Sequence, residues 1–300
     1  MKILMTGASG FVGQKLIKRL SGMDNIQLAV LTRQNGLAGG RRLNHICEYN
    51  WDIDRNLIDE KSMHGVDVIV HLAGEPVFEG RWSRNKKDKI YNSRVSGTKL
   101  LVETINKYHP GKIRLISTSA IGYYASNQVD ALTESGPQGC DFLAKVCKDW
   151  EEQAMRCPNT SIVRVGMVLG HEGGAFKKMR TLFKLGLGGT LGDGKQYMSW
   201  IHIDDLVEIY LWLIKNQDQT GVFNAVAPAP TTNYEFTKLL AKLLRRPAIL
   251  NIPAFILKGI LGEKSNLLLG SQKVVPKRLL DAGFTFQAKN IKDCLSQLLH

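Results

Sequence analysis

The stretch Thr6-Gly7-Ala8-Ser9-Gly10-Phe11-Val12-Gly13 follows a short apolar segment, Lys2–Thr6, and opens a segment with helical apolar spacing, Phe11–Leu20. A G-x-x-G-x-x-G run between a strand and a helix is typical of a turn that binds a dinucleotide. Gly7 permits the tight turn, Gly10 lets backbone N–H groups approach a pyrophosphate, and Gly13 lets the helix pack closely on the strand. The helix N-terminus favours the negative phosphates. The residues of this turn that we expect to contact a cofactor are Thr6, Gly7, Ser9, Gly10, Phe11, Val12 and Gly13.

The residue after the second expected strand, Gln27–Thr32, is Arg33, which lies 20 residues beyond Gly13. A carboxylate in this region would hold the ribose hydroxyls of NAD. A guanidinium instead forms a bidentate pair with a 2′-phosphate. The sequence therefore predicts NADP(H) as the cofactor, with Arg41 and Arg42 as candidates to extend the pocket. The alternative is an ordinary surface arginine at position 33.

Strand and helix signals alternate through the first two-thirds of the chain. Apolar runs without strict alternation suit parallel strands that are covered on both faces. The alternation predicts the α/β class, a doubly wound parallel sheet of Rossmann type with a smaller, mixed C-terminal substrate domain. The further strands expected are Val66–Leu72, Lys112–Ser117, Ser161–Leu169 and Phe223–Val226, and the further helices are Asn92–Tyr108, Phe142–Arg156 and Thr232–Leu244.

The pattern changes after Gly170. Lys184–Gly194 contains five glycines, and a strand and a helix return at Tyr197–Lys215, with Asp204 and Asp205 offering an N-cap at their junction. We expect residues 1–170, joined by 197–226, to form an NADP-binding Rossmann domain. Residues 171–196 and 227–300 would form the smaller substrate-side domain. The short apolar segment 251–262 predicts a packed helix and not a membrane anchor.

Composition limits the partners. The chain of 300 residues has 40 Lys and Arg against 27 Asp and Glu, a net charge of +13. Attraction to anions and a merely solvated basic surface both fit this excess. No RNA-binding motif, zinc-ligand spacing or run of about 18 apolar residues accompanies it, so we expect no nucleic acid, metal or membrane partner. Five cysteines without a C-x-x-C predict reduced thiols and a cytoplasmic location.

Several further stretches carry a resemblance to a known family. TGASGFVG, HLAGE (71–75), ISTSAIGYY (116–124) and WIHIDD (200–205) resemble the extended short-chain dehydrogenase/reductase superfamily. GVDVIVHLAGEPV, DFLAKVCKDWE, RVGMVLG, KLGLGGTLGDGKQYMSWIHIDDLV and LLLGSQKVVPKRLLDAGFTF resemble, more narrowly, its atypical "epimerase family" subgroup of NAD(P)-dependent epimerase/dehydratase-like proteins. The resemblance covers essentially the whole chain. It implies a Rossmann core that binds NADP(H), and it carries no known substrate. By analogy of fold alone, we expect a monomer or a homodimer.

The resemblance also implies cofactor contacts at two other strand ends. These are Leu72, Ala73, Gly74 and Glu75 after one strand, and Gly166, Met167 and Val168 after another. Arg81, on the loop after Glu75, and Ser117, near the end of the strand 112–117, are further expected contacts.

The superfamily pairs a serine or threonine with a Tyr-x-x-x-Lys on the next helix, in which the tyrosine is the general acid or base. Ser119 fits the hydroxyl position and Lys145 the lysine, but Asp141 stands where the tyrosine should be. Asp141 is either a base or a helix N-cap. Tyr123 either replaces the tyrosine as proton donor or covers the nicotinamide. The catalytic candidates are thus Ser119, Lys145, Tyr123 and Asp141.

Two functions follow from these residues. One is an NADP(H)-dependent oxidoreductase or epimerase that acts on an unknown small carbonyl or hydroxyl compound, with sugar-like molecules among the candidates. The other is a non-catalytic NADP(H)-binding sensor or regulatory protein, which would explain a complete glycine turn beside an incomplete proton-transfer pair.

Overall fold

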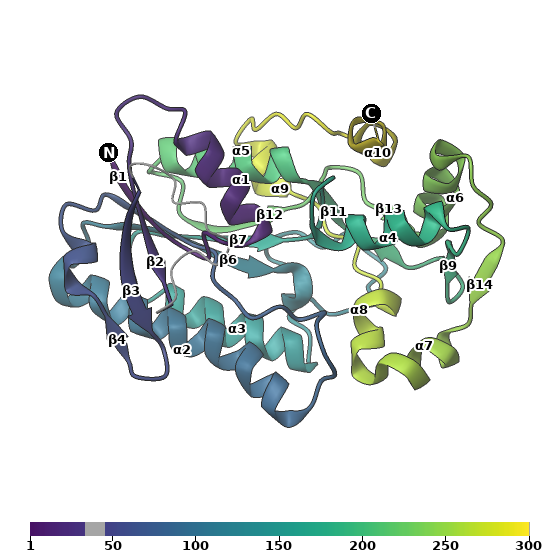
Figure 1. Ribbon diagram of the computed structural model, residues 1–300, viewed down its shortest axis with the longest axis horizontal. Helices are drawn as coiled ribbons and strands as arrows, with labels where there is room; N and C mark the ends of the chain where they lie inside the picture. Colours follow the sequence, from purple (N-terminus) through teal and green to yellow (C-terminus); the bar gives the residue numbers. More distant parts are fainter. Residues whose placement is uncertain (34–45, 300) are drawn as a thin grey trace.

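A computed structural model describes residues 1–33 and 46–299 of the chain. Its centre is an eight-stranded sheet with the strand order β12-β7-β6-β5-β1-β2-β3-β4 (Figure 1). All neighbouring strands are parallel except the antiparallel pair β3 and β4. The bounds of these strands are β1 Lys2–Thr6, β2 Gln27–Thr32, β3 Cys47–Asp52, β4 Leu57–Ile58, β5 Val68–His71, β6 Arg114–Ala120, β7 Thr160–Val165 and β12 Gly221–Ala225.

The α-helices of the described residues are α1 Phe11–Leu20, α2 Arg84–Tyr108, α3 Phe142–Ala154, α4 Gly174–Lys184, α5 Ile203–Lys215, α6 Asn233–Leu244, α7 Ala254–Leu261, α8 Asn266–Leu269, α9 Lys277–Asp281 and α10 Ile291–Leu299. Short 3-10 helices occupy η1 Glu60–Met63, η2 Ile121–Tyr123 and η3 Gly262–Ser265. No helix of the described residues combines the length and the apolar character needed to cross a bilayer.

Helices cover both faces of the large sheet. Successive side chains of a strand point to opposite faces, and here both sets are apolar and need cover. Ile3 and Met5 of β1 pack in a buried cluster with α1 and α5. Leu4, between them, packs in a second buried cluster with Leu101 and Ile105 of α2. Figure 1 shows α1 and α5 above the sheet and α2 and α3 below it. The predicted doubly wound parallel sheet is therefore confirmed.

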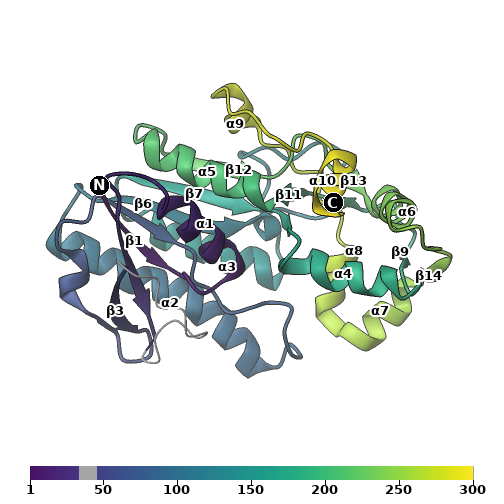
Figure 2. The same ribbon diagram turned by 45° about the horizontal axis from the view of Figure 1, so that its top comes forward.

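The C-terminal elements pack around a third buried cluster, which includes Phe176 and Phe183 of α4, Phe236 and Leu240 of α6, and Leu295 of α10. Small two-stranded sheets complete this group, which lies beside the carboxyl edge of the large sheet (Figure 2). These pairs are β8 Met167–Leu169 with β11 Trp200–His202, β9 Gly189–Leu191 with β14 Leu250–Ile252, and β10 Tyr197–Met198 with β13 Thr231–Thr232.

Two local expectations are wrong. The single strand expected over residues 161–169 is broken at Gly166, so that β7 pairs in the large sheet and β8 pairs with β11. Asp204 and Asp205 do not cap α5. Its N-cap is His202, whose Nδ1 accepts the Asp204 N–H at 3.2 Å, since the Asp205 carboxylate instead accepts the N–H groups of residues 287 and 288.

The packed helix expected within residues 251–262 is also corrected. The helix is present as α7, but Leu257 is its one buried side chain. Phe255 is 74% exposed and Ile260 is 73% exposed. The reason is visible in Figure 1, where α7 lies at the outer end of the C-terminal elements and has neighbours on one side only.

Candidate functional site

The glycine turn is closed to side chains. Gly7 has a positive φ of 70°, and a Cβ there would lie 2.7 Å from the backbone N of Ala73. A Cβ on Gly13 would overlap the carbonyl oxygen of Gly7. The Gly10 N–H donates to that same oxygen at 3.0 Å and closes the turn. The turn therefore depends on glycine at these positions because backbone occupies the space that a side chain would need.

The N-terminus of α1 is open to an anion. Its N-cap is Gly10, which has no side chain to accept from the first-turn N–H groups, and the first turn carries no acidic residue. Amide groups and the helix dipole together favour a phosphate at such an end. The glycine-lined turn and this uncapped helix end fit the pyrophosphate of a dinucleotide.

Thr6 and His71 tie the glycine turn to the end of β5. The Thr6 hydroxyl accepts the N–H groups of Leu72 and Ala73 at 3.2 and 3.1 Å. It therefore donates its own proton to Nδ1 of His71, at 2.7 Å, and Nε2–H donates to the Thr98 hydroxyl at 2.8 Å. Burial, with a smaller effect of the Arg94 charge, lowers the pKa of His71 to about 4. His71 is thus a neutral structural tie.

The side chains of Phe11 and Val12 face the protein. A Cβ on Gly173 would lie 2.5 Å from the Phe11 ring, and one on Gly170 would overlap it. The ring thus fills a glycine-lined socket before α4, and Val12 packs on the core beneath α1. Phe11 and Val12 can therefore contact a cofactor only through their backbone groups, whereas Ser9 is exposed at the turn. The socket links the start of α1 to the C-terminal elements, and the sequence analysis missed it.

Arg33 lies beside the glycine turn. The pairing of Thr6 with Leu31 places the end of β2 next to the end of β1, and Arg33 directly follows that end. Its side chain is exposed and has no ion pair with the described residues. Arg41 and Arg42 lie outside the described residues, so their expected contribution is not tested.

The turn after β5 is held by α2. The Glu75 carboxylate pairs with Lys86 at 2.6 Å, and the backbone N–H of Glu75 donates to the Ser93 hydroxyl at 3.0 Å. Arg94 donates to the Glu75 carbonyl at 3.0 Å, and its guanidinium carbon would lie 3.0 Å from a Cβ on Gly74. Arg94 was not predicted, although its spacing of four residues from the buried Ile90 and Thr98 places it on the inward face of α2.

The remaining expected contacts differ in exposure. Arg81 is exposed and Ser117 is fully buried. Gly166 lies against the backbone oxygen of Ser199, where a Cβ would approach to 2.6 Å. Met167 and Val168, which follow it in β8, are half-buried.

A buried ion pair lies behind the second part of the site. Arg164 donates to both oxygens of Glu151, at 2.8 and 2.7 Å, and the Ser119 hydroxyl donates to the same carboxylate at 2.6 Å. Burial alone would lower the pKa of Arg164, but the hydrogen bonds and the charge of Glu151 outweigh it and raise that pKa. Ser119 is therefore directed at Glu151, and neither partner of the pair was foreseen from the sequence.

The two tyrosines after β6 differ in environment. The ring of Tyr123 stacks on the Arg164 guanidinium, 3.5 Å from centroid to carbon, and is half-buried. The hydroxyl of Tyr124 is buried, donates to Asn224 at 2.6 Å and accepts from Arg164 at 2.9 Å. Burial raises the pKa of Tyr124 to about 12. Tyr123 is thus the more accessible of the two.

Asp141 is the N-cap of α3. Its carboxylate accepts the Ala144 N–H at 2.9 Å. Lys145, one turn later, is exposed and has no ion pair within residues 1–33 and 46–299. η2 packs on α3, since Gly122 faces Leu143, so Tyr123 and the start of α3 lie on the same side of β6.

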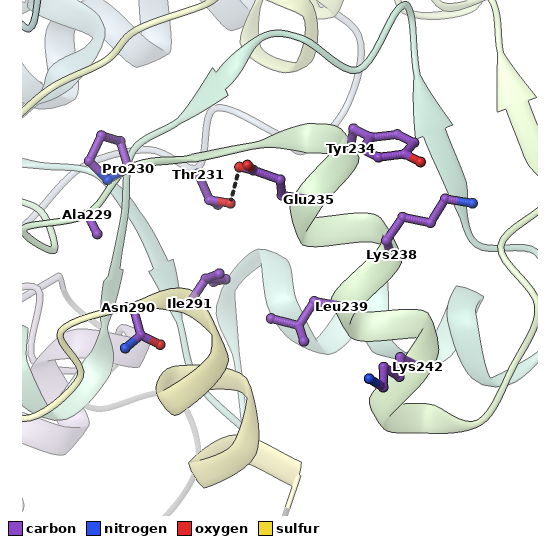
Figure 3. A pocket seen from close by; sticks show the side chains of 10 residues that line it. All are labelled: Ala229, Pro230, Thr231, Tyr234, Glu235, Lys238, Leu239, Lys242, Asn290 and Ile291. Carbon is purple, nitrogen blue, oxygen red and sulfur yellow. Dashed lines mark hydrogen bonds between the residues drawn. The ribbon is translucent and has the colours of Figure 1, made fainter.

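Two surface pockets lie among the C-terminal elements. The first, of about 530 Å³, is formed by the loop 229–231, α6 and α10, and Figure 3 shows Glu235 turned toward Thr231, to which it is hydrogen-bonded at 3.1 Å. The second, of about 600 Å³, includes Gly192 and Asp193 of the five-glycine segment and the buried Gln196. Nε2 of Gln196 donates to two backbone carbonyls, while its Oε1 has no partner among the described residues.

Other residues discussed as possible site members have structural positions. Trp200, in the WIHIDD stretch, is fully buried in the C-terminal cluster, and His202 caps α5. Within residues 1–33 and 46–299, no three His, Cys, Asp or Glu side chains come together as metal ligands.

Comparison with known proteins gives two family matches and several relatives. Residues 3–226 match the NAD dependent epimerase/dehydratase family, and residues 252–298 match a domain of unknown function (DUF1731). The chain is 37% identical over 310 residues to the chloroplastic "epimerase family protein SDR39U1 homolog" of Arabidopsis thaliana, covering 100% of this chain and 87% of that protein.

Solved structures agree with this match. The crystal structure of human epimerase family protein SDR39U1 (isoform 2) with NADPH is 29% identical, has a TM-score of 0.88 and covers 100% of this chain and 99% of that one. A nucleoside-diphosphate sugar epimerase from Corynebacterium glutamicum is 31% identical, with a TM-score of 0.78, over 100% of this chain and 58% of that one.

Proposed function

The chain belongs to the NAD dependent epimerase/dehydratase family, and on that premise we propose that it is an NADP(H)-dependent oxidoreductase or epimerase of a small carbonyl or hydroxyl compound. The observation that carries the proposal is the glycine turn, closed to side chains and joined to an uncapped helix end. The NADPH in the human relative's structure supports the same type of cofactor.

The preference for NADP(H) rests on Arg33. It follows the strand next to the glycine turn, it is exposed, and it has no ion pair with the described residues. A guanidinium in this place pairs with a 2′-phosphate through two parallel hydrogen bonds. The proposed contacts besides Arg33 are the residues of the turn, Leu72–Glu75, Arg81, Gly166, Met167 and Val168. Ser117 is fully buried, so a contact with it would need a local shift.

In the proposed reaction, a nicotinamide held by the glycine turn would supply the hydride for a substrate carbonyl, or would take it from the alcohol. Tyr123 donates the proton to the carbonyl oxygen, because its hydroxyl is the accessible one of the pair and Arg164 fixes its ring. Lys145, with no ion pair in the described chain, binds the nicotinamide ribose.

Ser119 has a different place in this scheme from the one expected. Its proton is donated to Glu151, so we assign it a positioning role through the Glu151–Arg164 pair, and not direct polarisation of the carbonyl. Asp141 accepts an N–H of its own helix, and the same carboxylate is the alternative base of this scheme.

We place the substrate at the pocket that includes Gly192, Asp193 and Gln196. Leu269 lines this pocket. Three residues later, Nε2 of Gln272 donates to the carbonyl of Tyr124 at 2.7 Å, which links this segment to the residue after Tyr123. The unpartnered Oε1 of Gln196 accepts a hydroxyl or amide N–H of the substrate. The proposed location is the cytoplasm, because the five cysteines are free thiols, and the proposed state is a monomer or homodimer.

The test is turnover of NADPH with a panel of aldehydes, ketones and keto sugars, together with product analysis of nucleoside-diphosphate sugars for epimerisation. A general acid contributes about 10²–10⁴-fold, so Tyr123→Phe should lower kcat by at least ~100-fold. Tyr234→Phe, at an exposed position on α6, is the matched control and should leave kcat unchanged. Absence of turnover across the panel, or full activity of Tyr123→Phe, would contradict the proposal.

A second candidate, a non-catalytic NADP(H) sensor, is favoured by Asp141, which serves as a helix cap where the superfamily has its tyrosine. A sensor must bind NADP⁺ and NADPH with different affinity, because a ligand shifts a population only through differential binding. Equal affinities for the two forms, measured by titration, would remove this candidate.

A further inference from the structure

Two segments of the C-terminal elements contain basic residues and no acidic ones. Residues 173–191 include four Lys or Arg, and residues 236–262 include five, with no Asp or Glu in either segment. Parallel pairing of β9 with β14, in which Gly189 lies opposite Leu250, joins the two segments in the fold. We call the exposed residues of these two segments the basic–apolar surface. Nine of the 40 basic residues of the chain thus lie in 46 residues that contain no Asp or Glu, and the flanking acidic residues are four: Glu172, Asp193, Glu235 and Glu263.

None of these nine side chains forms an ion pair within the described residues. Basic residues elsewhere commonly do, as Lys15 does with Asp204 and Arg19 with Glu208. Most of the nine are also exposed, including Lys184 at the end of α4, Arg245 and Arg246 after α6, and Lys258 on α7. Their charge is therefore available to an outside partner.

Large apolar side chains are exposed on the same segments. Ile249 is 85% exposed, and Phe255 and Ile260 on α7 are each more than 70% exposed. The other large apolar residues exposed here are Leu182, Leu185, Leu187, Leu250 and Ile256. Figure 2 shows the end of α4, β14 and α7 gathered at one end of the molecule. Contiguous exposure of apolar side chains marks an interaction surface more often than it marks ordinary protein exterior.

We propose that the basic–apolar surface docks on a membrane that contains anionic lipids. Lys and Arg are attracted to the anionic headgroups, while Phe, Leu and Ile enter the boundary between headgroups and acyl chains. α7 combines basic and apolar side chains in a single helix. Phe255, Ile256 and Ile260 are exposed beside the basic Lys258, while the buried Leu257 anchors the helix to the protein. Docking at the surface needs no spanning helix.

Charge and side-chain type distinguish the membrane from other occupants. A second copy of the chain would bring nine more positive charges against the first nine, and the four acidic residues that flank the segments in each copy offset fewer than half of them. Nucleic acid would satisfy the charges, but it offers no apolar phase to Ile249, Leu185 and Ile260, and single strands are bound by stacking on aromatic rings. An anionic bilayer is complementary to both the charge and the apolar groups.

This proposal needs no turnover, although Lys258 of the surface also lines the pocket at which we place the substrate. It departs from the expectation, drawn from the sequence, that no membrane is involved. That expectation rested on the absence of a spanning segment and on the assumption that residues 251–262 form a packed helix. The exposure of α7 removes the second ground.

The experiment is co-sedimentation of the full chain with vesicles of phosphatidylcholine alone, and with vesicles that contain roughly a third phosphatidylglycerol. We expect binding to the anionic vesicles only. Arg245→Glu/Arg246→Glu should weaken it by at least ~10-fold, since each basic residue near an anionic surface contributes several-fold. Phe255→Ser/Ile260→Ser should weaken binding as well. The remaining affinity of this variant should fall more steeply with salt than that of the wild type, because it depends more on charge.

Matched controls separate the surface from the net charge. Lys18→Glu/Lys215→Glu changes the net charge equally at exposed positions on α1 and α5, and Val129→Ser/Met155→Ser removes two exposed apolar groups elsewhere. Circular dichroism of each variant checks that it is folded. The proposal is overturned if anionic vesicles do not bind at low salt, or if the control pairs weaken binding as much as the test pairs. It is also overturned if a DNA or RNA oligonucleotide binds through Arg245 and Arg246 while vesicles do not.

Discussion

The carboxyl edge of the large sheet and the basic–apolar surface use charge in opposite ways. At the sheet edge, Arg164 and Glu151 are both buried and satisfy each other with two hydrogen bonds. On the basic–apolar surface, Arg245, Arg246 and Lys258 are exposed and have no ion pair within the described residues. The comparison teaches that a net charge of +13 does not describe a uniform surface. Charge at the first region holds the structure together, and charge at the second is available for binding.

The largest expected effect sharpens this contrast. Arg164→Met leaves Glu151 buried without its partner, which costs about 3–5 kcal/mol of unfolding free energy. Arg246→Met, the same change on the basic–apolar surface, should stay within ~0.5 kcal/mol because its side chain is exposed. Urea denaturation of both variants gives the comparison.

A double variant tests the reason for that loss. Arg164→Met/Glu151→Leu removes both charges, and it should recover a large part of the stability because no unpaired charge remains. If Arg164→Met costs no more than Arg246→Met, the two regions do not differ as described.

The second expected effect is a pH dependence at the sheet edge. His71 has a pKa of about 4 in the fold, against 6.5 when unfolded, because burial disfavours the charged form. The unfolded state therefore binds the proton first, and stability falls as the pH drops from 6.5 to 4, by about 3 kcal/mol in total from this group. Urea denaturation of wild type and His71→Gln between pH 4 and 7 measures it.

The difference between the two curves is the informative quantity. His71→Gln lacks this titration, so its stability should change less over the same pH interval, whatever its absolute value. His171→Gln, at an exposed position before α4, should follow the wild-type pH dependence. Parallel curves for wild type and His71→Gln would show that His71 does not carry the effect.

The third effect concerns two glycines. Gly13→Ala places a Cβ on the carbonyl oxygen of Gly7, so the turn must shift, at a cost of about 1–3 kcal/mol in unfolding free energy. The affinity for NADPH should fall with it. Gly259→Ala on α7 meets no atom within 4 Å and should stabilise the protein by about 0.5–1 kcal/mol. An unchanged NADPH affinity in Gly13→Ala would disprove the tight fit of the turn.

The smallest effect is the loss of a helix N-cap, which should lower the unfolding free energy equally in both regions. Asp141 caps α3 at the sheet edge and Thr232 caps α6 among the C-terminal elements. Replacing either with Ala should cost about 1 kcal/mol, and Asp141→Asn should cost much less because Asn is also a good cap. If Asp141→Asn keeps stability but loses turnover, the aspartate is a base after all.

The sequence predicted the sheet well, because each parallel strand is a local apolar run and the glycine turn is a local pattern. Gln27–Thr32 appears with the expected bounds. β3 was missed because its residues, CEYNWD, are mostly polar and only Trp51 is buried. The start of α2 at Arg84 was missed for a similar reason, since its first turn contains no apolar residue.

The site was less predictable where it depends on distant contacts. The Phe11 socket joins residues some 160 positions apart, and the Arg164–Glu151 pair joins β7 to α3. Neither contact leaves a local pattern in the sequence. The cap of α5 was misassigned because His202, Asp204 and Asp205 are all able to cap. Distant contacts decide between them, since Asp204 pairs with Lys15 and Asp205 accepts the N–H groups of residues 287 and 288.

The most direct test of the central claim is a calorimetric titration of nucleotide-free protein with NADPH and with NADH, repeated on Arg33→Ala. We predict that NADPH binds the wild type at least ~10-fold more tightly than NADH, a difference of about 1.4 kcal/mol, and that Arg33→Ala removes this difference. Equal affinity of the wild type for both nucleotides, or a preference that survives in Arg33→Ala, would contradict it.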